Sequence, residues 1–161
     1  MKTTNASFFC TTNAGEFLPV AITDIPIIEG QEVIETLADY CENFKDYAHC
    51  FTVYDIEDFA PNYTAYSFYE FIEIYNRMIG SVKNALCEYV EEYKEIESKI
   101  IEINAIKDDL TGVEFKAFLK KQSELMIEGI NIKWDAKKLA SEYGLTDFWE
   151  KQLERVAYVE R

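Results

Sequence analysis

The feature that most constrains the fold is a set of seven apolar and aromatic residues in the second half of the chain, which recur at alternating steps of four and three. They are Val82, Leu86, Tyr89, Tyr93, Ile96, Ile100 and Ile103. This spacing keeps all seven on one face of an α-helix, and it is the heptad spacing of a coiled-coil seam. Because such a helix has to bury its apolar face, helix–helix packing is expected in this half of the chain.

The residues that follow predict a second helix returning along the first. Thr111 and Glu114 have the spacing of a capping box, which predicts a helix from about 112 to 128 that ends at Gly129. Its inward residues would be Phe115, Phe118, Leu119 and Leu125. Two antiparallel helices joined by a short loop form an αα-hairpin, which is the expected core of residues 81–161.

The C-terminal segment carries weaker signals. Asp135 is expected to cap a short helix that ends before Gly144, and Thr146 is expected to cap another around Trp149. Residues 155–160 are consistent with a strand or with a frayed end.

Residues 1–80 alternate strand and helix patterns, which predicts an α+β domain with a small antiparallel sheet in the order β-β-α-β-α. Strands are expected at 6–11, 17–23 and 49–56, helices at 30–46 and from Ser67 onward, and a loop at 57–65. Ser67 and Glu70 form a capping-box pattern at the start of the last helix. Its inner face would hold Phe68, Phe71, Ile72, Tyr75 and Ile79.

Length and composition fit this division. The chain has 161 residues, of which 48% are hydrophobic, with only 6 glycines and 3 prolines. It is therefore expected to fold into an acidic α+β domain over 1–80 and a helical region over 81–161, without a long linker.

The charge is strongly negative and unevenly distributed. The chain has 30 acidic and 16 basic residues, a formal net charge of −14. Residues 1–80 contain 13 acidic and 3 basic residues (−10), whereas residues 81–161 contain 17 and 13 (−4). Phosphate backbones and anionic membranes repel such a protein, so we expect neither direct nucleic-acid binding nor membrane binding. A basic protein partner is favoured.

No apolar run is long enough for a membrane span, and the first residues lack the apolar region of a signal peptide, so a cytoplasmic location is expected. The four cysteines are then expected to be reduced thiols. They are Cys10, Cys41, Cys50 and Cys87.

Five acidic residues of the expected 30–46 helix recur at steps of three and four, which would place them on one face. They are Glu32, Glu35, Asp39, Glu42 and Asp46. Such a stripe would span roughly 21 Å, over which one strand of B-DNA carries about six phosphates. Two interpretations stay open: a solvated acidic face, or a phosphate-mimicking face for a basic groove.

Further carboxylates would extend this surface from the neighbouring loop and helix. They are Asp55, Glu57, Asp58, Glu70 and Glu73. The residues from Asp55 to Asp58 could instead hold a divalent cation in a hydrolase, but they lack the order of an EF-hand loop, and a water-solvated loop is favoured. His49 and Cys50 are adjacent strand residues that would face opposite sides of a sheet, a poor arrangement for a catalytic dyad. We therefore predict no catalytic residue, cofactor or metal.

Two stretches of the first half match short motifs of a known family. The first runs from the strand residues Phe8-Phe9-Cys10 through Asn13-Ala14-Gly15-Glu16 and Pro26-Ile27 to an acidic helix starting near Glu32-Val33. The second joins a strand at 51–59 to a helix at 66–76. Over residues 5–80 these stretches resemble the opening domain of the ArdA antirestriction proteins: the strand at 51–59 is similar to the family's strand ending in D-Y-E, and the helix is similar to its S-x-x-E-L helix.

This resemblance implies a protein of a mobile genetic element that evades host defence. ArdA proteins imitate bent B-form DNA with surface carboxylates and occupy the DNA groove of type I restriction-modification enzymes. The implied partner is thus the basic DNA-binding groove of a restriction-modification enzyme or of another defence protein. The alternative is a non-enzymatic interaction module that uses the helical hairpin, with acidity serving solubility only. A homodimer stays open in either case.

Overall fold

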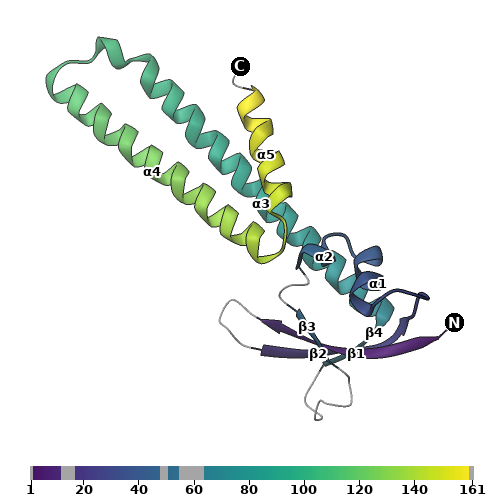
Figure 1. Cartoon of the computed structure of the whole chain (residues 1–161). Helices are drawn as coiled ribbons and strands as arrows, with labels where there is room; N and C mark the ends of the chain where they lie inside the picture. Colours follow the sequence, from purple (N-terminus) through teal and green to yellow (C-terminus); the bar gives the residue numbers. More distant parts are fainter. Residues whose placement is uncertain (1, 12–16, 48–50, 55–63, 160–161) are drawn as a thin grey trace. The chain divides into compact units, whose positions relative to one another are not determined.

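The computed structural model describes residues 2–11, 17–47, 51–54 and 64–159, and it confirms the α+β class (Figure 1). The elements are β1 (Thr3–Thr11), β2 (Phe17–Pro26), α1 (Val33–Tyr40), α2 (Phe44–Tyr47), β3 (Phe51–Tyr54), β4 (Thr64–Ser67), α3 (Phe68–Ala105), the 3₁₀ turn η3 (Lys107–Asp109), α4 (Gly112–Glu142) and α5 (Thr146–Val159). The chain divides into two compact units, Met1–Ser81 and Val82–Arg161. The boundary expected from the sequence is one residue earlier.

The sheet of the first unit has four strands in the order β3-β1-β2-β4. β1 pairs antiparallel with β2 and with β3, whereas β4 pairs parallel with β2, so that Val20 lies opposite Thr64. The expectation of a purely antiparallel sheet is therefore wrong. Residues 64 and 65, predicted to lie in a loop, begin β4. The four residues of β4 are too few to show a periodic pattern, which is why the strand was missed.

β2 also continues past Thr23, where the sequence predicts its end. Asp24 adopts a positive φ of 59°, and the register of β1 against β2 shifts between Thr4 and Ala6. The Asn5 Oδ1 accepts a hydrogen bond from the Asp24 N–H at 3.1 Å. The bulge accommodates Asp24, so the pairing of β1 with β2 resumes beyond it and continues to Pro26.

Aromatic rings form much of the core of the first unit. Phe8 of β1 stacks on Phe71 of α3, with ring centroids 6.1 Å apart, and its edge meets Phe44 of α2 at 6.3 Å. Phe44 in turn contacts Tyr75 at 5.3 Å. Because α2 supplies a fully buried ring, this four-residue helix is held by packing rather than by its own propensity.

A single helix, α3, replaces the two helices expected on either side of Gly80. It begins at the predicted capping box, where the Glu70 carboxylate accepts hydrogen bonds from both the N–H and the hydroxyl of Ser67 at 2.8 Å. Although α3 has 38 residues, neither it nor another helix among the described residues is long and apolar enough to cross a membrane.

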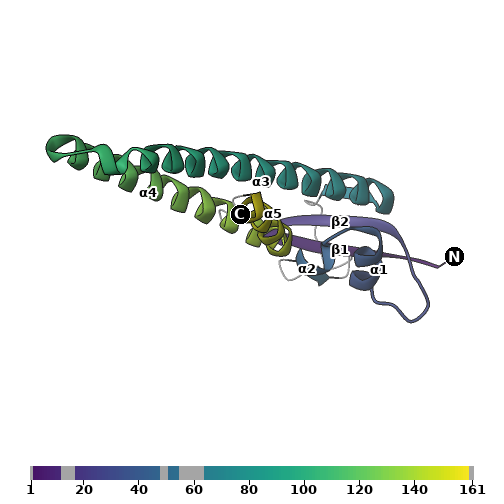
Figure 2. The same cartoon turned by 90° about the horizontal axis from the view of Figure 1, so that it is seen from above.

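In the second unit, α4 lies antiparallel to the C-terminal part of α3 (Figure 2). Gln122 donates a hydrogen bond to the Asn104 side chain at 2.9 Å, and a β-carbon at Gly129 would lie 3.4 Å from Ile96 Cγ2. α4 does not end at Gly129 as predicted but continues to Glu142. Gly129 is a point of close helix approach, not a C-terminal signal.

Three smaller expectations also need correction. Thr111 is the N-cap of α4, but its side chain makes no capping hydrogen bond. Asp135 lies inside α4 rather than at the start of a short helix, and residues 155–159 belong to α5 rather than to a strand. α5 is fixed by Trp149 and Val156, which are buried.

Candidate binding surfaces

The predicted acidic stripe is interrupted, because residues 30–46 do not form one helix. α1 ends at Cys41, whose backbone is extended, and Asn43 has a positive φ of 66° before α2 begins. Asparagine tolerates this left-handed conformation better than most residues. The turn lets Cys41 and Phe44 both enter the core. The free energy gained by burying these two side chains outweighs the helical hydrogen bonds that are lost at the turn. Glu42 and Asp46 therefore do not continue the helix face of Glu35 and Asp39, whereas Glu32 lies at the N-cap of α1.

The carboxylates of this region are nevertheless all exposed. Glu32 is the N-cap residue of α1, and its N–H donates a hydrogen bond to the Glu35 carboxylate at 2.9 Å. Asp39 accepts a hydrogen bond from the Gln31 amide at 2.9 Å. Both bonds fix carboxylates locally without neutralising their charge, so α1 presents negative charge to solvent.

The two predicted carboxylates of α3 have different surroundings. The backbone N–H and then the hydroxyl of Ser67 lower the pKa of Glu70 by hydrogen bonding to its charged form. Glu73 forms a salt bridge of 2.9 Å with Arg77 one turn later, and both side chains are largely exposed. Glu70 thus has a structural role in the capping box, and Glu73 is partly neutralised.

The remaining predicted positions lie outside the described residues. These are Asp55, Glu57, Asp58, His49 and Cys50. Within the described ranges, no group of three or more His, Cys, Asp or Glu side chains is arranged to hold a metal ion.

The described part of the first unit still has an acidic surface. Its nine carboxylates are all exposed, whereas its exposed cations are Lys2, Lys45 and Arg77. The nine are Asp24, Glu29, Glu32, Glu35, Asp39, Glu42, Asp46, Glu70 and Glu73. The negative charge is thus a property of the surface of the whole unit rather than of one helix face.

Two reactive side-chain types of the first unit are buried behind this surface. Burial raises the pKa of the Cys41 thiol to about 12, so that the group is neutral at pH 7. Burial is also the main cause that raises the pKa of Tyr75, with a smaller contribution from the negative charge of Asp46. Neither side chain is set up as a nucleophile or base at neutral pH.

A second surface, which we call the α4 apolar face, lies on the second unit and was not predicted. It consists of Leu119, Met126, Ile127, Ile130 and Trp134. Their exposed fractions range from 44% for Leu119 to 71% for Trp134. At 3.6 residues per turn these positions share one side of α4, more than a third of a turn from the buried residues Phe118, Leu125 and Ala136.

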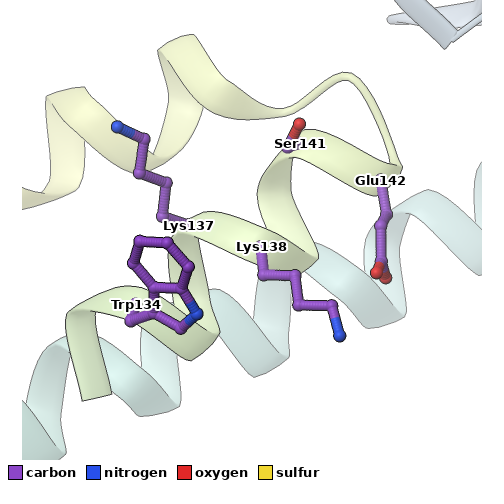
Figure 3. Close-up of a pocket in the computed structure, with 5 residues that line it drawn as sticks. All are labelled: Trp134, Lys137, Lys138, Ser141 and Glu142. Carbon is purple, nitrogen blue, oxygen red and sulfur yellow. The ribbon is translucent and has the colours of Figure 1, made fainter. Parts of the chain in front are cut away.

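The C-terminal end of the α4 apolar face opens into a hollow of about 370 Å³ (Figure 3). It is lined by Trp134, Lys137, Lys138, Ser141 and Glu142. In Figure 3, Lys138 and Glu142 project to the same side of the helix, as expected for residues one turn apart. The hollow therefore combines a large aromatic ring with charges of both signs.

This face was not predicted, because a helix that ends at Gly129 with Leu119 facing inward contains no such stripe. The spacing of Ile127, Ile130 and Trp134 becomes a helical stripe only if α4 continues past the glycine. By contrast, the predicted apolar seam of α3 packs against α4 of the same chain, since Ile96 is buried and Tyr93 lies against Gly129.

Comparisons of the chain with protein-family models, with curated proteins and with solved structures found no match.

Proposed function

We propose that the protein is a non-enzymatic inhibitor whose first unit imitates the charge of a DNA backbone and occupies the basic DNA-binding groove of a host defence enzyme. A type I restriction-modification enzyme is the proposed target. The observation that supports this proposal is the excess of exposed carboxylates over cations among the described residues of the first unit, nine against three. Solubility alone does not require such an imbalance, since the second half of the chain mixes both signs.

The mechanism needs only competitive occupancy. The carboxylates of the inhibitor would occupy the basic groove of the target in place of DNA phosphates, and long-range electrostatic attraction would accelerate the encounter. Because α1 and α2 are separate helices, the charges of this region do not form one straight stripe. Association is expected to slow as salt screens the attraction.

The test is inhibition of DNA cleavage by a purified type I enzyme. The variant Glu35→Lys, Asp39→Lys, Glu42→Lys reverses three exposed charges of the first unit. It is expected to raise the concentration for half-inhibition by about tenfold or more, because attraction becomes repulsion at each site.

A matched control carries the same change in net charge on the second unit: Glu114→Lys, Glu128→Lys, Glu150→Lys, all at exposed positions. Inhibition by the control is expected to stay close to that of the wild type. Equal losses in both variants would show that only total charge matters. Absence of inhibition by the wild type at low salt would reject this target. Circular dichroism of each variant verifies the fold.

The second candidate is a protein-interaction module based on the helical unit, and the exposed α4 apolar face favours it. Contiguous apolar surface of this extent marks interaction sites in soluble proteins. Under this candidate, Ile127→Glu would abolish capture of a partner while the Glu35, Asp39 and Glu42 reversals would not.

A further inference from the structure

We propose that the α4 apolar face binds the same face of a second copy of the chain, in an antiparallel α4–α4 pair related by a two-fold axis beside Asn131. This inference is independent of the proposed function and rests on area, charge and shape within the second unit.

The area is sufficient for a weak dimer. The five side chains of the α4 apolar face leave on the order of 600 Å² uncovered in each copy, and two such faces reach about 1,200 Å², the lower limit of specific interfaces. Trp134 would supply the type of large aromatic anchor that dominates binding energy in such interfaces.

The charges along the edge of the face select the second copy and its direction. Lys120 and Glu124 are followed, on the same edge remote from α3, by Lys138 and Glu142. In an antiparallel pair centred at Asn131, Glu124 lies opposite Lys138 of the second copy, and Lys120 lies opposite its Glu142. The two-fold axis repeats both pairs, which gives four attractive contacts. In a parallel two-fold pair this edge would lie on opposite sides of the two helices, so these four residues would not meet.

The intramolecular contact of these residues does not prevent this pairing. Lys120 and Glu124 approach each other only at 3.9 Å, and their side chains are 81% and 55% exposed. A surface pair of this kind contributes little and exchanges easily for a contact across an interface.

The position of the hollow is compatible with the same pairing. In the same arrangement the apolar segment from Leu119 to Ile127 of one copy faces residues 135–143 of the other, where the hollow beside Trp134 lies (Figure 3). The half of the face that carries Leu119, Met126 and Ile127 thus meets the hollow beside Trp134 twice, once on each side of the axis.

The first experiment is sedimentation of the full chain over a wide concentration range. We expect a reversible monomer–dimer equilibrium that Ile130→Glu weakens by at least about tenfold, because a charge is buried on each side of the axis. The matched control is Ile101→Glu on α3, where the side chain is equally exposed (57% against 60%). A chain that stays monomeric at every concentration, or a dimer that Ile130→Glu leaves unchanged, would overturn the proposal.

A charge exchange then tests the direction of the pair. Glu124→Lys and Lys138→Glu are each expected to weaken the dimer, since each creates two repulsive contacts. An equimolar mixture of the two variants restores both contacts in a mixed dimer, which mass spectrometry under native conditions detects. If the mixture associates no better than either variant alone, the antiparallel register is wrong. Because these experiments measure mass and not inhibition, their failure is distinguishable from failure of the proposed function.

Discussion

At the scale of single residues, the start of α3 depends on a reciprocal pair. Ser67 donates its N–H and hydroxyl to Glu70, and the Glu70 N–H approaches the Ser67 Oγ at 3.4 Å. These bonds satisfy groups that a helix start otherwise leaves open. A local pattern of two side chains therefore fixes the point at which β4 ends and α3 begins.

Ser67→Ala is expected to lower the free energy of unfolding by about 1 kcal/mol, as for the loss of other helix caps. It should also raise the pKa of Glu70, which the Ser67 hydrogen bonds hold below its usual value. Because the folded-state pKa is the lower one, the contribution of Glu70 is complete above the unfolded-state pKa and is lost as the pH falls through the folded-state pKa.

Urea unfolding and an NMR titration of the Glu70 carboxyl measure the two effects. The cost of Ser67→Ala is expected to shrink in acid. An unchanged carboxyl titration in the variant would show that the Ser67 hydroxyl does not contribute to the lowered pKa, since the backbone N–H bond remains.

At the scale of elements, tertiary contacts decided what local patterns could not. The heptad run at 82–103 and the Ser67–Glu70 box were predictable because their signals are local. The end of α1 at Cys41 was not, since it depends on burying Phe44 against Phe8 and Tyr75. The acidic positions could be named from the sequence, but their alignment could not.

The role of Gly129 likewise depends on a tertiary contact, the close approach of α3 and α4, that local sequence patterns do not reveal. A β-carbon there would lie 3.4 Å from Ile96 Cγ2 and 3.5 Å from Tyr93 Cε2, which is about van der Waals contact. Gly129→Ala is therefore expected to raise the free energy of unfolding by up to about 1 kcal/mol through helix propensity. Gly129→Leu is expected to lower it by about 1–3 kcal/mol through overpacking.

The control is Gly80, a second glycine inside a helix, where a β-carbon would meet nothing within 4 Å. Gly80→Leu should therefore be tolerated. Equal effects of leucine at both positions, measured by thermal unfolding, would contradict the close approach of α3 and α4.

At the scale of the whole molecule, charge and stability are in conflict. In a protein with a net charge of −14 the surplus carboxylates repel one another, and residues 1–80 carry −10 of this net charge. Screening by salt relieves this repulsion. A surface selected for stability alone would carry more cations among the carboxylates of the first unit.

We expect hydrogen-exchange protection of the β1 and β2 amides to rise as salt increases from about 0.01 to 0.2 M, because the Debye length falls from about 30 Å to below 10 Å. Amides of α4, in the mixed-charge unit, should change less and serve as the internal control. Protection that falls with salt in β1 and β2 would mean that attractive pairs, not repulsion, dominate the first unit.

The parallel pairing of β4 with β2 has a consequence for synthesis on the ribosome. β1 and β2 are complete once Pro26 has emerged, but the partner of Val20 on the other side is Thr64, which is made much later. During that interval the open edge of β2 can accept a strand from another chain. The order of translation therefore makes the nascent first unit most prone to aggregation before Ser67 leaves the ribosome, and a slower stretch of translation between these residues would lower the yield of folded protein.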